Sequence, residues 1–394
     1  MGPELAPRDM QRRAFVVVID ACGVGELPDA ARYGDAGANT LLHVAQAVGG
    51  LELPTFGRLG LGNILDLPGV APSRAPVLHG RLAPLGPGKD SSTGHWELMG
   101  VVVEEPPPTY PDGLPAPLRD HVETTIGSPV ICNRPQNGIA AIEEYGEEHL
   151  AGGWPILYTS QDSVIQLAAH TSVISAERLY AMCAALRASL QAPGAVRRVI
   201  ARPFDGAPGG FTRTTGRRDY TLPPPSPSQL ELLAAAGVPV HGVGKAPELF
   251  AGIGFSSVHP GATNGEAIAS MEHLIGELDT GLVFANLIET DQVYGHRKDS
   301  AGFHRALQVI DAALARWLSA TREGDLLLLT ADHGCDPASA HTDHTREYAP
   351  LLAWFAGHGG RRRDGPLADV GASVLDWLTG GRAALAGRSF IADA

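Results

Sequence analysis

Residues 326–333 read LLLLTADH, four consecutive leucines followed by Thr330, Ala331, Asp332 and His333. A continuous apolar run this short is typical of a strand that is buried on both faces of a parallel sheet. Asp332 and His333 come where that strand would end. In open parallel sheets, ligands bind in the crevice at the carboxyl ends of the strands. The stretch therefore predicts both a buried strand and a polar site at its end.

Four other apolar runs share this character, at residues 15–19, 238–243, 282–288 and 351–355. Between the runs, residues 265–278 and 303–320 carry apolar side chains at spacings of three and four, which predicts helices. Alternating strands and helices predict an α/β fold, with a doubly wound, mostly parallel sheet as its core.

Two proline-rich stretches, at residues 101–117 and 223–228, interrupt this pattern. Proline runs cannot continue helices or central strands, so both stretches are candidate linkers. The segment between them has its own helical patterns at 140–150 and 175–190, and strand patterns at 155–160 and 197–204. We therefore expect a core domain made of residues 1–101 and 223–394, and a smaller inserted α+β cap domain at 102–222.

The composition is that of an acidic globular protein, with 394 residues, 44% hydrophobic, 19% charged, and a formal net charge of −13. This charge argues against a nucleic-acid-binding surface, because phosphate backbones select basic faces. The four cysteines form no C-x-x-C pair, so we expect reduced thiols. No apolar stretch reaches the length of a bilayer span. We expect a cytoplasmic protein with no membrane, nucleic-acid or obligate protein partner.

Carboxylates follow three of the expected strands: Asp20 after FVVVI, Asp291 after VFANLIET and Asp332 after LLLLTA. A strand-end Asp is often only a helix N-cap, which is the better interpretation for any one of them alone. Three unpaired carboxylates in one crevice would repel each other unless cations lay between them. Three histidines follow nearby, His296, His333 and His344. The mixture suits Mn²⁺ or Zn²⁺, and six ligands suffice for the two ions of an in-line phosphoryl displacement.

A cluster of basic residues indicates an anionic ligand. Six arginines lie within 22 residues of the expected cap: Arg197, Arg198, Arg202, Arg213, Arg217 and Arg218. Most would be solvated surface residues, and one or two would bind phosphate through their guanidinium forks. Lys245, at the end of another expected strand, is a second phosphate candidate. A P-loop is excluded, since neither Gly-Lys pair has the required glycine before it or the Ser or Thr after it.

The stretch GKDSSTGHWE, residues 88–97, offers a nucleophile beside these metals. A hydroxyl held against a divalent cation loses its proton more easily and can attack phosphorus. A serine at the start of a helix can instead be a simple N-cap. The residues alone do not choose among Ser91, Ser92 and Thr93.

Ten stretches together make the chain similar to the prokaryotic phosphopentomutase family of the alkaline phosphatase superfamily. They are VVVIDACGVGELPDA, GKDSSTGHWELMGV, PILYTSQDSVIQLAAH, RRVIARPF, GFTRT with RRDY, HGVGKAPELFAGIG, FANLIETDQVYGHRKD, and TADHGCDP with TDHTREYAPLL. They follow the family's order over nearly the whole chain, including the inserted segment. The resemblance implies an alkaline-phosphatase-like core with an inserted cap.

The resemblance also implies residue roles. Asp20, Asp332 and His333 would bind one Mn²⁺, and Asp291, His296 and His344 the second, with other divalent cations as substitutes. Ser91, directly after Lys89-Asp90, would carry the phosphoryl group; the family usually has threonine there. Ser92 and Thr93 would then shape the loop and cap the helix. Substrate contacts would come from Ser160, Asp162, Arg202, Arg213 and Lys245. The family's glycine before TDH is His341 here, and its part in metal binding is open.

The activity implied is the interconversion of α-D-ribose 1-phosphate and ribose 5-phosphate, and of the 2-deoxy sugars, in nucleoside salvage and pentose phosphate metabolism. A phosphoserine enzyme and a 1,5-bisphosphate intermediate would carry it, after activation by a sugar bisphosphate such as glucose 1,6-bisphosphate. The cap would exclude water from the phosphoenzyme. Two alternatives remain: a metal-dependent phosphatase or other phosphomutase on the same core, and a non-catalytic sugar-phosphate-binding protein.

Overall fold

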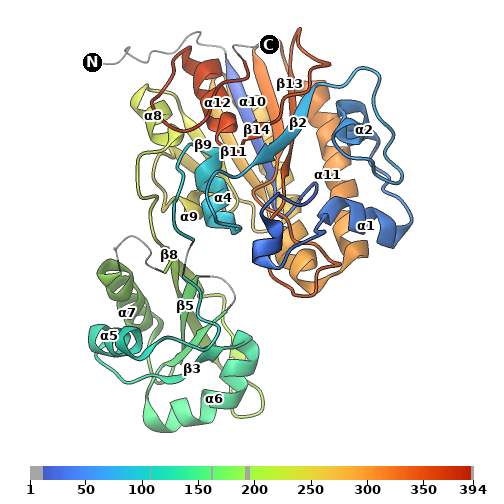
Figure 1. The fold of residues 1–394 in the computed structure, drawn as a ribbon. Coiled ribbons are helices and arrows are strands. Elements are labelled where there is room, and N and C mark those ends of the chain that lie inside the picture. The colour runs from blue at the N-terminus through green and yellow to red at the C-terminus, as the bar shows by residue number, and fades with distance from the viewer. Residues whose placement is uncertain (1–11, 107, 161–162, 191–195, 392–394) are drawn as a thin grey trace. The chain divides into compact units, whose positions relative to one another are not determined.

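A computed structural model describes residues 12–106, 108–160, 163–190 and 196–391. The chain divides into two compact units (Figure 1). The larger unit comprises Met1–Glu104 and Pro224–Ala394, and the smaller comprises Glu105–Pro223. In the described part of the chain, no helix combines the length and the apolar character needed to cross a membrane.

The larger unit is built on an eight-stranded sheet in the order β10-β9-β11-β1-β12-β13-β2-β14. The strands are β10 (Ser257–His259), β9 (Val240–Val243), β11 (Gly281–Leu287), β1 (Arg13–Ile19), β12 (Asp325–Thr330), β13 (Ala349–Phe355), β2 (Leu78–Ala83) and β14 (Gly365–Pro366). The first five are parallel to one another, and β13 is antiparallel to both β12 and β2. The prediction of a mostly parallel sheet is confirmed.

Two groups of helices cover this sheet. On one side, α11 (Ser300–Ala320) contacts α1 (Thr40–Val48), α2 (Pro54–Leu59) and α10 (Asn264–Glu277). On the other side, α12 (Asp369–Thr379) contacts α8 (Gln229–Ala235) and α4 (Ser91–Leu98), and α4 contacts α9 (Ala246–Leu249). A short helix, α3 (Leu61–Ile64), lies against β2 and β13. Helices in two groups are the doubly wound arrangement that the alternating pattern predicts.

The central strands explain why the core forms here. Every residue of β1, β11 and β12 is buried. Such strands need apolar side chains on both faces, which is why they occur as continuous runs of Val, Leu and Phe. At their amino ends Arg13 donates two hydrogen bonds to Asp325, at 2.7 and 2.6 Å, and this buried ion pair joins β1 to β12.

The smaller unit has its own sheet, in the order β3-β4-β5-β6-β7, with β8 paired to β6. Its strands are β3 (Ile131–Pro135), β4 (Ile156–Thr159), β5 (Val164–His170), β6 (Arg198–Asp205), β7 (Thr212–Arg213) and β8 (Arg218–Thr221). Its helices are α5 (Ala116–Ile126), α6 (Gly138–Gly152) and α7 (Ala176–Ser189). Two separate apolar clusters, one with α5 and α7 and one with α6, stabilise it.

Candidate metal centre

Three neighbouring strands of the larger sheet deliver the three predicted carboxylates to one place. Asp20 follows β1 directly, and Asp332 comes two residues after β12. Asp291 lies in a π-helical turn, Thr290–Tyr294, after β11. Because β11, β1 and β12 are adjacent and parallel, their carboxyl ends meet at the same edge of the sheet.

The first group of ligand atoms surrounds His333. Its Nε2 lies 3.3 Å from Asp20 Oδ1 and 3.3 Å from Asp332 Oδ2. The hydroxyl of Ser91 lies 3.2 Å from the same nitrogen. Ligand atoms that each lie roughly 2.0–2.2 Å from the same metal ion are separated from one another by distances of this order. The group therefore fits a divalent cation without a rearrangement of the backbone.

The second group surrounds Asp291. His344 Nε2 lies 3.4 Å from its Oδ1, and His296 Nε2 lies 3.4 Å from its Oδ2. The rings of His333 and His344 stack with centroids 3.9 Å apart, so the two groups adjoin. Together they bring the six predicted ligands into one continuous cluster.

Unpaired polar atoms in this cluster provide a test of whether cations fit. Among the buried side-chain atoms without a hydrogen-bond partner in the described residues, four belong to the predicted ligands: Asp20 Oδ1, Asp291 Oδ1, Asp332 Oδ2 and His344 Nε2. A buried polar atom without a partner costs about 1–3 kcal/mol, and more when it is charged. The oxygen and nitrogen chemistry of these four atoms suits Mn²⁺ or Zn²⁺. The residues present therefore fit two divalent cations.

The pKa shifts of the carboxyl groups in the cluster also favour a bound cation. Burial and the neighbouring Asp332 raise the pKa of Asp20, so this carboxyl lacks sufficient positive charge around it. Burial also raises the pKa of Asp291, but His344 and His296 outweigh it and hold that pKa well below its usual range. A cation between the carboxylates would favour the ionised form of all three.

Metal binding is expected to release about two protons per protein molecule at pH 7. Burial lowers the pKa of His296, but Asp291 and Cys335 raise it to about 12. Burial likewise lowers the pKa of His333, while Asp332 and Asp20 raise it well above its usual value. Both rings are therefore protonated on both nitrogens near neutral pH, and a metal ion must displace one of these protons from each ring. The affinity for metal should consequently increase with pH. Calorimetric titration with Mn²⁺ in buffers of different ionisation enthalpy counts the protons; binding without proton release would contradict this account.

The backbone beside Asp20 is held in an uncommon conformation. Ala21 has a φ of 63°, in the left-handed region that a residue with a side chain rarely adopts. Its N–H donates to Asp332 Oδ1 at 3.3 Å. Strain of this kind persists only where surrounding contacts hold it, and such residues gather at functional sites. Here the hydrogen bond from Ala21 to Asp332 links the ends of β1 and β12.

The beginning of α4 separates the three candidate hydroxyls. Asp90 is the N-cap of this helix, and its carboxylate accepts from the N–H groups of Ser92 and Thr93 at 3.0 and 3.2 Å. Thr93 Oγ1 donates to the same carboxylate at 2.6 Å. The expectation that Ser92 or Thr93 caps the helix is therefore wrong, because a carboxylate can accept several N–H groups at once. Of the three, Ser91 is the one whose hydroxyl contacts the metal cluster, through His333.

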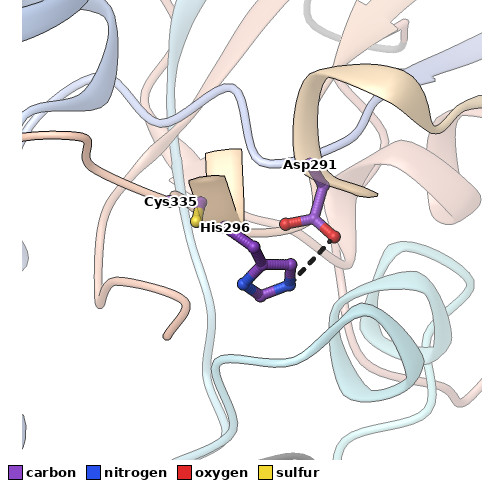
Figure 2. A group of neighbouring side chains, drawn as sticks. All are labelled: Asp291, His296 and Cys335. Carbon is purple, nitrogen blue, oxygen red and sulfur yellow. Dashed lines mark ion pairs between the residues drawn. The ribbon is translucent and has the colours of Figure 1, made fainter. Parts of the chain in front are cut away.

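Cys335 is a further ligand-type side chain, and the sequence prediction does not include it. Its Sγ lies within 4.8 Å of the ligand atoms of Asp291 and His296. Figure 2 shows these three side chains, with the ion pair between His296 and Asp291 as a dashed line. Burial raises the pKa of the thiol, and His296 lowers it by less. Cys335 therefore remains a neutral thiol near neutral pH and is a neighbour of the predicted ligands.

His341, whose part in metal binding the sequence left open, has a different partner. Its Nε2 lies 2.8 Å from Asp35 Oδ1, and its Nδ1 accepts from the N–H of Asp343 at 3.2 Å. Asp35 also accepts from Lys89 at 3.1 Å and from the Arg346 N–H at 2.8 Å. His341 thus belongs to a network that supports the loop before Ser91.

The predicted substrate contacts lie in both units. Lys245 is the residue before α9, at the carboxyl end of β9, and is partly exposed. In the smaller unit, Arg202 donates two hydrogen bonds to Gln166 Oε1, at 3.2 and 3.1 Å. Burial and the nearby Arg217 lower the pKa of Arg202 to about 10. Arg213 is exposed on β7, and Ser160 follows β4. Asp162 lies outside the described residues.

Two polar residues that the sequence prediction missed lie inside the cluster. His95 and Asn286 are both fully buried, and each contacts a predicted metal ligand. Asn286 is a polar residue within the apolar run VFANLI, and this interruption of the run is a signal that could have identified it. His95 gives no comparable signal, because a single buried histidine in a helix is common.

Comparisons with known proteins relate the chain to one family. A family profile described as "Metalloenzyme superfamily" matches residues 12–379. The chain is 47% identical to a phosphopentomutase of Anaeromyxobacter sp. (strain K) over 98% of this chain and 99% of the relative. It is 48% identical to a phosphopentomutase of Dictyoglomus turgidum (strain DSM 6724 / Z-1310) over 87% of each. Among solved structures, a Leishmania mexicana phosphoglycerate mutase aligns over 98% of this chain and 99% of its own, with 15% identity and a TM-score of 0.49.

Proposed function

Since the chain belongs to the phosphopentomutase family and to the Metalloenzyme superfamily, we propose that it interconverts α-D-ribose 1-phosphate and ribose 5-phosphate, and the 2-deoxy sugars likewise. The enzyme is thus an isomerase that moves a phosphoryl group between two oxygens of one sugar. The observation that carries the proposal is the position of the Ser91 hydroxyl, 3.2 Å from His333 within the metal cluster.

Ser91 is the proposed phosphoryl carrier. The free hydroxyl of the bound sugar phosphate attacks the phosphorus on phosphorylated Ser91. As the new O–P bond forms, the Ser91 Oγ–P bond breaks and the hydroxyl proton passes to the departing Ser91 Oγ. The product of this half-reaction is a 1,5-bisphosphate. Ser91 Oγ then attacks the other phosphorus of the bisphosphate, the sugar O–P bond breaks, and the Ser91 proton passes to the released sugar oxygen. This restores the phosphoserine and leaves the isomerised monophosphate. Bound divalent cations would neutralise the transferring group and favour the ionised hydroxyl.

The chain contributes to this transfer in two further ways. Ser91 is the first residue of α4, where the helix dipole favours negative charge such as that of a phosphoryl group. Asp90 holds the N–H groups of Ser92 and Thr93, so the first turn is fixed before any ligand arrives. A nucleophile fixed in this way needs little reorganisation during the reaction.

We assign recognition of the sugar phosphate to Lys245, Arg202 and Arg213 for the phosphate, and to Ser160 and Asp162 for the sugar hydroxyls. The guanidinium forks can bind phosphate oxygens in pairs, while Lys245 acts as a point charge. The partial burial of Arg202 supports its selection, since a desolvated guanidinium interacts more strongly with an anion. We further propose Mn²⁺ as the metal and a sugar bisphosphate, such as glucose 1,6-bisphosphate, as the activator.

A coupled assay tests the proposed reaction against its alternatives. With Mn²⁺ and glucose 1,6-bisphosphate present, we expect ribose 5-phosphate and deoxyribose 5-phosphate to be converted to the 1-phosphates faster than inorganic phosphate is released. Release of phosphate that outpaces isomerisation would indicate a phosphatase. Absence of both reactions, with no phosphoryl group on the protein by intact-mass analysis after bisphosphate treatment, would indicate a binding protein.

A further inference from the structure

His95 occupies a place from which it can control the first metal group. It lies in α4, one turn after Ser91, and is fully buried. Gly94 allows this helix to come close to the end of β12, because a Cβ at Gly94 would lie 2.5 Å from the carbonyl oxygen of Asp332. The ring of His95 also packs against Phe284 of β11, with centroids 5.7 Å apart. Its orientation is therefore fixed on several sides.

One ring nitrogen of His95 faces two oxygen atoms. Nδ1 lies 2.9 Å from the backbone oxygen of Ser91 and 3.1 Å from Asp332 Oδ2. Both oxygens are acceptors, so Nδ1 must carry the hydrogen. The carboxylate oxygen is one of the buried atoms of the metal group with no hydrogen bond of its own in the described residues. The nearby N–H dipole thus favours the ionised form of Asp332 and the orientation of its Oδ2 toward the cluster.

The other ring nitrogen of His95 faces an amide. Nε2 lies 3.0 Å from Asn286 Nδ2, and the same Nδ2 donates to Asp20 Oδ2 at 3.1 Å. If the amide were turned over, its oxygen would face the carboxylate of Asp20, and two acceptors would repel each other. Asp20 as an ionised ligand therefore fixes the amide of Asn286, and the amide requires Nε2 to be an acceptor. This leaves His95 neutral, with its hydrogen on Nδ1.

From this geometry we propose that His95 is a positioning residue, which together with Asn286 connects Asp20, Asp332 and the backbone of Ser91 into one rigid unit for the first metal ion. His95 is not a ligand and contacts no reacting atom. Its Nδ1 contacts the carboxylate of Asp332, and the amide of Asn286 donates to the carboxylate of Asp20. The inference rests on the proposed metal site, but it does not depend on the identity of the sugar substrate. Substitution of a residue that contacts a metal ligand in this way typically weakens metal affinity about 10–100-fold.

Two substitutions test the roles of the two ring nitrogens of His95 separately. In His95→Asn the amide nitrogen can replace Nδ1–H, which keeps a donor toward Asp332 and Ser91. In His95→Gln the amide reaches the position of Nε2 and keeps the contact with Asn286, but it loses the donor toward Asp332. We expect the Mn²⁺ dissociation constant, measured by calorimetry on protein stripped of metal, to increase about 10–100-fold in His95→Gln and by less than about threefold in His95→Asn. Equal losses of affinity in both variants, or no loss in either, would overturn the proposal.

A general packing defect would give a different result. The unfolding temperature of the metal-stripped variants measures the cost of altering a buried ring, and a purely structural role would lower it in both without separating their affinities for Mn²⁺. A second measurement needs no variant. The ¹⁵N shifts of the ring nitrogens in the Mg²⁺- or Zn²⁺-loaded protein report the tautomer of His95, and we expect hydrogen on Nδ1 alone. Hydrogen on Nε2 would overturn the proposal, whatever the outcome of the mutase assay.

Discussion

Replacing Ser91 by alanine is expected to lower mutase turnover by about ten-thousandfold or more, since it removes the atom that would carry the phosphoryl group. The substitution deletes one oxygen and leaves the first turn of α4 intact, because Asp90 caps that turn through the backbone of Ser92 and Thr93. Alanine is also a good helix former, so the free energy of unfolding should change by less than about 1 kcal/mol. The loss would therefore be chemical rather than structural.

Ser92→Ala is the matched control for this experiment. It removes a buried hydroxyl one residue away, in the same helical turn, and should leave substantial activity. Ser91→Thr keeps the hydroxyl and adds a methyl group, so it should retain activity also. Turnover comes from the coupled assay, and intact mass after bisphosphate treatment reports the phosphoryl group directly. A fully phosphorylated Ser91→Ala protein would show that another residue is the acceptor.

Removal of the divalent cations is expected to reduce turnover by about a thousandfold or more, and to lower the unfolding temperature. Cations supply several kcal/mol of stabilisation to a transferring phosphoryl group, and about 4 kcal/mol corresponds to a thousandfold change in rate. Stability falls as well, because the three buried carboxylates then have only the protonated rings of His296 and His333 as a counter-charge. An ion present at 100 times its dissociation constant contributes about 2.7 kcal/mol of folding free energy.

Chelation followed by addition of single metals measures this effect. We expect Mn²⁺ to restore the most activity, since three carboxylates and three imidazoles form a mixed oxygen and nitrogen ligand set. The metal content of the chelated protein and its circular dichroism are the controls for complete stripping and for folding. Unchanged turnover in protein whose metal content has fallen far below one ion per chain would refute a metal-dependent mechanism.

Cys335 and His341 both lie near the predicted metal ligands or the Ser91 loop, but neither belongs to the predicted ligand set. Cys335 lies close to Asp291 and His296, so a thiophilic ion could draw it into the ligand set where Mn²⁺ would not. His341 contacts Asp35 instead of the metal cluster, and Asp35 in turn contacts Lys89. Changes at His341 should therefore act through the loop before Ser91 and leave the number of bound ions unchanged.

Local patterns in the sequence are enough to predict much of the fold. The apolar runs that become β1, β11 and β12 are continuous because both faces of these strands are buried, and this requirement is visible residue by residue. The meeting of Asp20, Asp291 and Asp332 follows from the same fact, since parallel strands end at one edge of the sheet. The antiparallel direction of β13 could not be predicted this way, because a buried strand has the same composition in either direction.

Tertiary structure alone decided which atoms meet. The residues SST offer three hydroxyls that could each be the nucleophile. Only the fold shows that the Thr93 hydroxyl donates to Asp90 while the Ser91 hydroxyl contacts His333. Which way a hydroxyl points depends on the backbone angles at the start of α4 and on the approach of β12, some 240 residues later in the chain. The contacts of His95 with Asp332 and Asn286 also join segments that are far apart in sequence. Burial and periodicity are local properties of a sequence, whereas a hydrogen bond between distant segments exists only once the chain has folded.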